Sequence, residues 1–256
     1  MAEAADMIVF ITGATAGFGE ATARRYIAAG ARVIGTGRRA GRLEALADEL
    51  GERFLPLALD VTREDDVNAA VQGLPDDFAR VSVLVNNAGL ALGLEPAQNC
   101  DMPDWTTMIA TNINGLLYCT RALLPGMVAR DRGHVVNIGS VAGTYPYPGG
   151  NVYGATKAFV HQFSLNLRSD VSGSQVRVTS IEPGLAETEF SLVRFDGDRG
   201  KAAAPYKGLQ PLTAEDIAES VFYVTTLPAH VNINVIEMMP VMQAFAGFSF
   251  HRDGDG

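Results

Sequence analysis

Short apolar runs alternate along the chain with longer stretches in which apolar residues recur every three or four positions. Apolar runs of this length are typical of strands buried on both faces, and the longer spacing is typical of helices with one buried face. The runs predicted as strands are 7–12, 32–36, 54–58, 81–85, 134–138, 176–181 and 233–238. The stretches predicted as helices are 17–29, 42–50, 63–71, 105–129, 153–171 and 214–226.

This alternation of strand and helix predicts an α/β protein. Repeated strand–helix units favour a parallel sheet with helices on both faces, so we expect a Rossmann-type doubly wound sheet of about seven strands. The 256 residues contain no Pro/Ser-rich linker and no repeat, which indicates one domain over residues 1–256. Within it, the glycine-rich stretch 187–211 is expected to form a substrate lid, and residues 239–256 a C-terminal tail.

Charge and composition narrow the function classes. The net charge of −9 disfavours nucleic acid and anionic membranes as partners, and no apolar stretch approaches 18 residues. The first residues lack the basic segment of a signal peptide, so we expect a cytoplasmic protein. Cys100 and Cys119 form no CxxC pair, and the four histidines show no metal-ligand spacing. We therefore expect reduced cysteines and no metal.

The turn between the first strand and the first helix is rich in glycine. Gly13, Gly17 and Gly19 fall in the pattern GxxxGxG, which allows a tight turn, a close approach of the backbone to a ligand, and close helix–strand packing. A helix N-terminus at this point offers free N–H groups to phosphates. The sequence therefore predicts a dinucleotide pyrophosphate site, with a purely structural turn as the alternative.

Two arginines follow the second predicted strand. A reader of a free ribose 2′-hydroxyl would be an acidic residue near this position, whereas the chain has Arg38 and Arg39. Guanidinium groups bind phosphate well and are disfavoured at a helix N-terminus, so a ligand explains them better than a solvated helix start. We therefore expect NADP(H) as the cofactor, in preference to NAD(H).

A tyrosine and a lysine lie four residues apart on a predicted helix. Tyr153 and Lys157 would share one helical face, where the ammonium could lower the pKa of the phenol. Ser140 follows the fifth strand and could donate to a substrate carbonyl, or could simply cap a turn. Asn87 lies in an Asn-rich turn after the fourth strand, at the sheet edge where ligands bind. Asn112 is a polar residue inside a helical stretch, where it could instead mark a kink.

Together these residues resemble the short-chain dehydrogenases/reductases of the NADP-dependent 3-hydroxy acid (serine, allo-threonine) dehydrogenase type. The resemblance runs from residue 7 to about residue 252. The general motifs are the loop 12–19, residues 60–61, 86–89 and 183–184, and the four residues Asn112, Ser140, Tyr153 and Lys157. The motifs of the subgroup are 12–20, 87–93, 149–159 and 227–234.

The resemblance implies a role for each matching residue. Tyr153 would be the general acid or base, Lys157 would lower its pKa and hold the nicotinamide ribose, Ser140 would polarise the carbonyl, and Asn112 would fix a relay water. The cofactor would lie against Gly13, Thr15, Gly17, Phe18, Gly19, Arg38, Arg39, Asp60, Val61, Asn87, Ala88, Gly89, Pro183, Gly184 and Thr188. Asp60 and Val61 would contact adenine, Asn87 a ribose, and Thr188 the carboxamide.

The expected reaction is the NADP(H)-dependent interconversion of a small hydroxy acid and its carbonyl form, for example the reduction of malonic semialdehyde. Residues 183–190 are one residue shorter than is usual in the hydroxy acid enzymes and resemble those of sulfoacetaldehyde reductases. Reduction of sulfoacetaldehyde to isethionate is therefore the alternative. A non-catalytic NADP-binding sensor is the alternative outside the enzymes, since a fold does not fix a function.

A small anionic substrate needs a basic partner. Arg194 is the only basic residue between Arg177 and Arg199, and a guanidinium can hold a carboxylate or a sulfonate with two hydrogen bonds. Tyr147 and Gln243 could add donors. In the alternative interpretation Arg194 pairs with Glu189 or Asp196 of the lid.

Apolar stripes on two long helices bear on assembly. One stripe is Leu116, Leu117 and Leu124, and the other is Ala158, Phe159, Phe163 and Leu167. Each stripe could be buried against the sheet, but relatives use these helices in a four-helix interface, so we expect a homotetramer. The run 238–250 is too apolar for a free tail and is expected to cover a neighbouring subunit or the substrate pocket.

Overall fold

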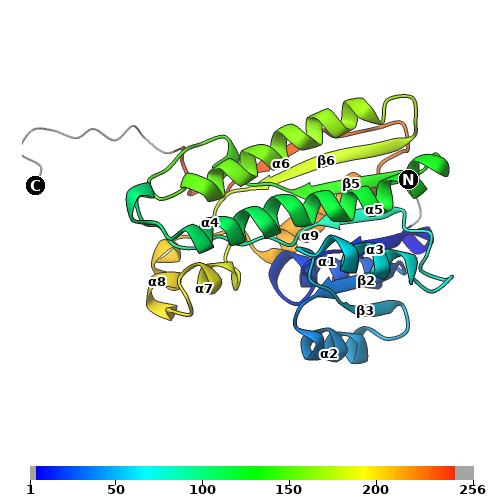
Figure 1. Ribbon diagram of the computed structural model, residues 1–256, viewed down its shortest axis with the longest axis horizontal. Coiled ribbons are helices and arrows are strands. Elements are labelled where there is room, and N and C mark those ends of the chain that lie inside the picture. Colours follow the sequence, from blue (N-terminus) through cyan, green and yellow to red (C-terminus); the bar gives the residue numbers. More distant parts are fainter. Residues whose placement is uncertain (1–3, 246–256) are drawn as a thin grey trace, which may run out of the picture.

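The sheet contains seven parallel strands in the order β3-β2-β1-β4-β5-β6-β7 in a computed structural model that describes residues 4–245 (Figure 1). The predicted doubly wound α/β fold is confirmed. Strand order runs one way from β1 to β3 and the other way from β4 to β7, so β1 and β4 flank the switch point where such sheets bind ligands. The strands are β1 (Ile8–Ile11), β2 (Arg32–Gly37), β3 (Phe54–Ala58), β4 (Val83–Asn86), β5 (Gly133–Ile138), β6 (Val176–Pro183) and β7 (Val235–Met238).

Helices cover both faces of the sheet. They are α1 (Gly17–Ala28), α2 (Ala40–Leu50), α3 (Glu64–Gln72), α4 (Met102–Ile109), α5 (Leu116–Ala129), α6 (Asn151–Asp170), α7 (Phe190–Arg194), α8 (Arg199–Ala203) and α9 (Ala214–Thr226). Strand residues alternate between two cores. Val9 and Ile11 pack with α1, α2 and α9, whereas Phe10 packs with α3, α5 and α6. The inner strands β1, β2, β4, β5 and β6 are mostly buried on both faces, so their apolar runs are continuous, as the sequence predicted, whereas the edge strands β3 and β7 are partly exposed.

The long helix predicted over residues 105–129 is interrupted. Residues Met102–Ile109 are α4, Ala110–Gly115 form one wider π-helical turn, and Leu116–Ala129 are α5. The π turn carries Asn112, which is 2% exposed. Such turns occur at functional sites because the extra residue turns a side chain out of the regular helical register. This turn aims Asn112 at the loop after β4.

The expected lid is more regular than its composition indicated. It contains the short helices α7 and α8, which project beyond the carboxyl end of the sheet (Figure 1). Ala186 and Leu212 form a parallel β-bridge at its base, with Glu187 N donating to Leu212 O over 2.9 Å. The two ends of the lid therefore lie side by side.

The stripe residues divide between core and surface. Leu116 and Leu167 are buried in this chain's own core, so for these two the burial alternative holds. Leu117 and Phe159 are half-buried, and Phe159 stacks on Phe163 with ring centroids 5.7 Å apart. A stripe of half-buried apolar side chains thus stays on the surface of these helices.

The C-terminal run is described only as far as residue 245, so residues 246–250 of it lie outside the described residues. Within the described part, Val241 is fully exposed, and the ring of Phe245 packs on that of Tyr145 with centroids 4.7 Å apart. No helix among residues 4–245 combines the length and the apolar character that crossing a membrane would require.

Candidate active site

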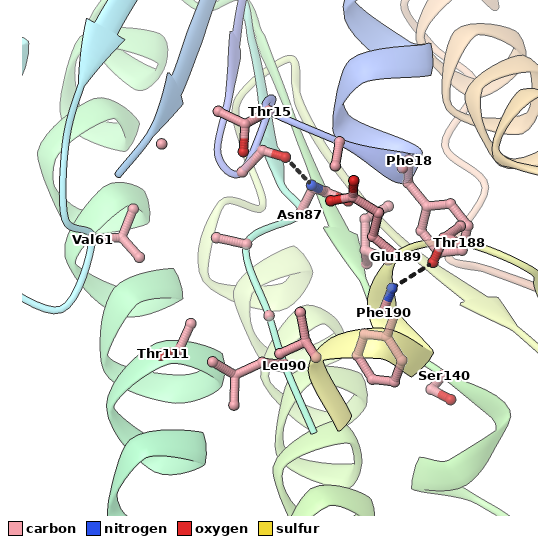
Figure 2. Close-up of a pocket in the computed structure, with 18 of the residues that line it drawn as sticks. Thr15, Phe18, Val61, Asn87, Leu90, Thr111, Ser140, Thr188, Glu189 and Phe190 are labelled. Atoms are coloured by element: carbon pink, nitrogen blue, oxygen red, sulfur yellow. Dashed lines mark hydrogen bonds between the residues drawn. The ribbon is translucent and has the colours of Figure 1, made fainter. Parts of the chain in front are cut away.

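A cleft of about 470 Å³ opens at the carboxyl ends of the strands, on the switch point between β1 and β4. Figure 2 shows Thr15 and Asn87 on the sheet side and Thr188, Glu189 and Phe190 on the lid side. The cleft brings together most residues that the sequence singled out. They are Gly13, Thr15, Gly17, Phe18, Arg38, Arg39, Asp60, Val61, Asn87, Ala88, Gly89, Ser140, Tyr153, Lys157, Pro183, Gly184 and Thr188.

The glycine loop has the geometry that a bound phosphate group requires. Gly13 and Gly17 adopt φ of 70° and 55°, a region that other residues rarely enter. Helix α1 begins at Gly17 behind Ala16, and no side chain caps its first turn. Its first N–H groups are therefore available to an anion in the cleft. The donor set and the close-approach glycines fit the pyrophosphate of a dinucleotide.

Asn87 holds this loop against the end of β4. Its Nδ2 donates to Gly13 O over 3.1 Å (Figure 2) and to Thr12 O over 2.9 Å. Gly19 does not line the cleft but lies behind the loop, where a Cβ atom would overlap Gly13 O and come within 2.6 Å of Asn87 Nδ2. The third glycine of the motif therefore has a packing role, and its expected contact with the phosphates, through the first turn of α1, stays a prediction.

At the opposite end of the cleft, basic side chains gather around Thr15. Arg39 donates to Thr15 Oγ1 from Nε at 3.0 Å and from Nη2 at 2.7 Å. Arg42, which the sequence analysis did not single out, donates to both carboxylate oxygens of Glu189 at 2.9 and 2.8 Å. Arg38 lines the cleft and makes no hydrogen bond or ion pair among residues 4–245. This end of the cleft fits an additional phosphate.

Asp60 and Val61 lie between the arginines and the π turn. Asp60 Oδ1 accepts from the backbone N–H and the hydroxyl of Thr62. Burial opposes ionisation of this carboxyl, but the Thr62 hydrogen bonds and the charge of Arg38 prevail and lower its pKa. Val61 packs against Gly115 so closely that a Cβ atom there would lie 2.7 Å from Val61 Cγ2. These two residues close one side wall of the cleft.

The residues with acid–base chemistry lie at the inner end. Tyr153 and Lys157 are both buried on α6, and Ser140 follows β5. The Ser140 hydroxyl accepts from Ala142 N and donates to Pro183 O. Ser140 therefore caps the turn after β5 and also lines the cleft. Lys157 Nζ donates to Ile138 O over 2.8 Å and lies 5.8 Å from the Tyr153 ring centroid.

Burial dominates the ionisation of this pair. It raises the pKa of Tyr153 to about 12, although the Ser140 hydroxyl and the Arg194 charge act to lower it. It lowers the pKa of Lys157 to about 8. The expected lowering of the tyrosine pKa by Lys157 is wrong for this structure, because the ammonium is directed to Ile138 O while the phenol loses its hydration.

Asn112 anchors the π turn to both sides of the cleft. Its Oδ1 accepts from Leu90 N over 2.9 Å, and its Nδ2 donates to Leu90 O and to Thr156 Oγ1 over 2.9 and 3.0 Å. A Cβ atom on Gly89 would lie 3.4 Å from Asn112 Oδ1 and 3.6 Å from Lys157 Nζ. The side chain therefore joins the β4 loop to the helix that carries Tyr153 and Lys157.

Arg194 reaches the catalytic end from the lid. Its guanidinium lies 5.6 Å from the ring centroids of both Tyr147 and Tyr153, and it donates to Tyr147 Oη over 3.0 Å and to Gly93 O over 3.1 Å. Among the described residues no carboxylate lies within ion-pairing distance of it. Tyr147, Arg194 and Gln243 are not among the residues that line the cleft, and Gln243 Oε1 accepts from Leu185 N over 2.7 Å.

Several residues that line the cleft were not predicted from the sequence. Leu90, Thr111, Phe190 and Val193 add apolar and hydroxyl surface, and Glu189 adds a charge. Phe190 could have been found as an apolar residue next to Thr188, but the pairing of Glu189 with arginines about 150 residues earlier has no local signal. No group of three or more His, Cys, Asp or Glu within residues 4–245 is placed to hold a metal ion.

Comparisons with known proteins cover nearly the whole chain. A family model described as short chain dehydrogenase matches residues 7–197. The chain is 62% identical over 247 residues to the NADP-dependent 3-hydroxy acid dehydrogenase YdfG of Salmonella typhi, covering 96% of this chain and 100% of that protein. It is 57% identical over 245 residues to the serine 3-dehydrogenase of Agrobacterium fabrum, with coverages of 96% and 98%.

A solved structure shows the same agreement in space. The closed form of a serine dehydrogenase complexed with NADP+ superposes with a TM-score of 0.95 at 59% identity, covering 96% of this chain and 100% of that one. The family model spans the glycine loop, the tyrosine–lysine pair and Arg194.

The buried ammonium of Lys157 should change how the free energy of unfolding depends on pH. Because the pKa of Lys157 is lowered to about 8 in the folded state, the unfolded chain binds more protons above that pH. The contribution of Lys157 to the free energy of unfolding should therefore rise by about 2 kcal/mol between pH 7 and 9.5. Urea unfolding of the wild type and Lys157→Met at both pH values would measure this difference.

The exposed Lys207 provides the control, because Lys207→Met should leave the pH dependence of the wild type unchanged. Parallel stability–pH curves for the wild type and Lys157→Met would contradict the shifted pKa.

Proposed function

We propose that this chain, which belongs to the short-chain dehydrogenase family, is an NADP(H)-dependent oxidoreductase that interconverts a small hydroxy acid and its carbonyl form. One observation carries the proposal. A single cleft joins Tyr153, Lys157 and Ser140 at one end to Arg38 and Arg39 at the other, with an uncapped helix N-terminus between them. The family model and the relatives confirm the family predicted from the sequence motifs, whereas the roles of individual residues belong to the proposal.

Tyr153 transfers the proton in this proposal. With its pKa raised to about 12, the phenol is protonated at neutral pH and can donate to the carbonyl oxygen during reduction. In the oxidation of an alcohol, it must first release that proton. Ser140 lies on the same inner wall and holds the carbonyl oxygen by donating from its hydroxyl. The nicotinamide supplies or accepts the hydride when it is bound.

Lys157 and Asn112 support this proton transfer. Lys157 holds a positive charge close to the phenol while its pKa of about 8 allows it to exchange protons near neutral pH. Asn112 fixes the Leu90 backbone and Thr156, so its side chain sets the distance between the loop after β4 and α6. The water relay implied by the resemblance would pass between these two side chains, where Gly89 leaves room.

The cofactor assignment rests on the other end of the cleft. The pyrophosphate would lie over Gly13 and Gly17 at the start of α1, and the 2′-phosphate would lie near Arg38, Arg39 and Thr15. The two curated relatives and the solved structure support this choice, since one relative is named as NADP-dependent and the structure contains NADP+. Charge-assisted hydrogen bonds to phosphate favour NADP(H) by about tenfold or more over NAD(H).

The substrate class follows from Arg194. The guanidinium lies over the Tyr153 ring, and its Nη1 makes no hydrogen bond among the described residues. It can bind the anionic group of a substrate whose carbonyl faces Tyr153, with Tyr147 beside it. The names of the relatives favour a 3-hydroxy acid or serine. The resemblance of the sequence motifs adds allo-threonine and the reduction of malonic semialdehyde to the proposed reactions. Sulfoacetaldehyde has an anion of the same charge and remains the alternative substrate.

The proposal extends to assembly and location. The half-buried stripe of Leu117, Phe159 and Phe163 supports a homotetramer built on α5 and α6, and the two unpaired cysteines support a cytoplasmic enzyme, to be checked by cell fractionation. Burying such a stripe between subunits removes apolar surface from water.

A substrate panel tests the reaction itself. Wild-type enzyme should oxidise NADPH steadily with malonic semialdehyde or sulfoacetaldehyde, and less efficiently with NADH in place of NADPH. Tyr153→Phe keeps the ring but removes the hydroxyl, so kcat should fall by about 10²–10⁴-fold while the Kd for NADPH changes by less than about twofold. Absence of turnover with every semialdehyde, together with tight NADPH binding, would instead support a sensor.

The role of Arg194 has its own test. Arg194→Ala should lower kcat/KM for an anionic semialdehyde by an amount equivalent to about 2–4 kcal/mol, because the substrate anion would be buried unpaired. The loss for a neutral aldehyde of similar size should be small. Arg199→Ala, an exposed arginine of the same lid, is the matched control. Equal losses on both substrates would mean that Arg194 only shapes the lid.

Light scattering at micromolar concentration tests assembly. The wild type should have four times the mass of the chain, and Phe159→Glu should shift it to smaller species, because a charge in an apolar interface is costly. A monomeric wild type would refute the tetramer.

A further inference from the structure

Glu189 connects three segments that are distant in the sequence. It lies on the lid directly before α7, and its carboxylate accepts from Arg39 Nη1 over 3.0 Å and from Arg42 Nη1 over 2.9 and 2.8 Å. Arg39 in turn donates to Thr15 of the glycine loop. All of these residues except Arg42 line the cleft, and Figure 2 shows Glu189 on the lid across from Thr15. The lid, the start of α2 and the glycine loop therefore meet at one cluster of charges.

Arg39 uses different edges of its guanidinium for these two partners. The Nε and Nη2 edge faces Thr15 Oγ1 over 3.0 and 2.7 Å, whereas Nη1 is bound by Glu189. A guanidinium is planar with donors in a fixed fork, so binding one corner orients the opposite edge. The orientation held by Glu189 thus turns two donors toward the part of the cleft beside Thr15.

We propose, on the basis of the NADP(H) assignment above, that Glu189 is a positioning residue for the cofactor's 2′-phosphate. It holds Arg39 with the Nε and Nη2 edge directed at the phosphate, and Arg42 holds Glu189 in place through both carboxylate oxygens. In this arrangement a lid carboxylate strengthens the binding of an anion, although its own charge has the same sign.

The charges around Glu189 are compatible with the binding of a phosphate. Arg38, Arg39 and Arg42 carry three positive charges, and Glu189 and Asp60 carry two negative ones, so the cluster keeps a net positive charge for a phosphate. Arg42 rather than Arg39 makes the two-oxygen contact with Glu189. A carboxylate that competed with the phosphate would instead be expected to cover the Nε and Nη2 edge that faces the cleft.

The contact also connects the cofactor to the substrate end. Phe190 follows Glu189, and its ring centroid lies 5.7 Å from that of Tyr153. Arg194, the proposed anion anchor, lies at the end of the same short helix. An enzyme that holds its 2′-phosphate through Glu189 therefore also fixes the start of the lid that covers Tyr153.

Binding of two nucleotide fragments separates this role from others. We would measure the Kd of 2′,5′-ADP and of 5′-AMP by calorimetry, since they differ only in the 2′-phosphate and lack the nicotinamide. Glu189→Gln should weaken 2′,5′-ADP by about tenfold and change 5′-AMP by less than about twofold. The matched control is Glu187→Gln, which removes the same charge two residues away at an exposed side chain with no hydrogen bond to the arginines.

A double substitution assigns the effect to Arg39. In an Arg39→Ala background, Glu189→Gln should change the Kd of 2′,5′-ADP by less than about twofold, because there is no longer a guanidinium to orient. An undiminished effect of Glu189→Gln in that background would overturn the assignment.

Four further results would also overturn the proposal. Tighter binding of 2′,5′-ADP by Glu189→Gln would make Glu189 a competitor of the phosphate. Equal weakening of both nucleotides would make it a general support of the lid. A wild type that binds 2′,5′-ADP no better than 5′-AMP would remove the NADP(H) assignment as well. A wild-type preference for 2′,5′-ADP that is undiminished in Glu189→Gln would overturn only the role of Glu189.

Discussion

The cleft depends on the contact between two loops that leave neighbouring strands in opposite directions. After β1 the chain turns toward one face of the sheet, and after β4 toward the other, which would leave an open gap between them. The Asn87 amide spans that gap by donating to the carbonyls of Thr12 and Gly13. The loops come so close that Gly19 has no space for a Cβ atom. The start of α1 is therefore held at a fixed height above the sheet, where it faces the pocket.

The inner end of the cleft contains buried ionisable groups, and their burial lowers the stability of the fold. Lys157 is a buried cation whose hydrogen bond among the described residues goes to one backbone carbonyl, and Tyr153 is a buried phenol with its pKa raised to about 12. Buried ionisable groups of this kind reduce stability and are typical of functional sites. The surrounding network of Asn112, Leu90 and Thr156 offsets the cost by holding α6 against the β4 loop.

The sequence predicted those features whose signals are local. Helix α9 has the bounds that its apolar spacing predicted, and the structure shows a capping box of Thr213 and Asp216 at its start. The glycine loop and the tyrosine–lysine pair are likewise local spacings. The π turn was missed because its apolar pattern continues that of a helix, and α7 and α8 because helices of five residues show too little periodicity. The ion pairs of Glu189 were missed because its partners are 147 and 150 residues away.

The β-bridge between Ala186 and Leu212 has an evolutionary consequence. Because Ala186 and Leu212 pair at the base of the lid, the 25 residues between them form a closed loop. The length of this loop can change without moving the strands of the sheet. The entropy of closing such a loop grows only slowly with its length, by about 0.6 kcal/mol for each doubling. Insertions, deletions and exchanges within the lid can therefore accumulate without disturbing the strands that hold Ser140 and the glycine loop. A lineage with this bridge can therefore vary its lid while inheriting Ser140, Tyr153 and Lys157 unchanged.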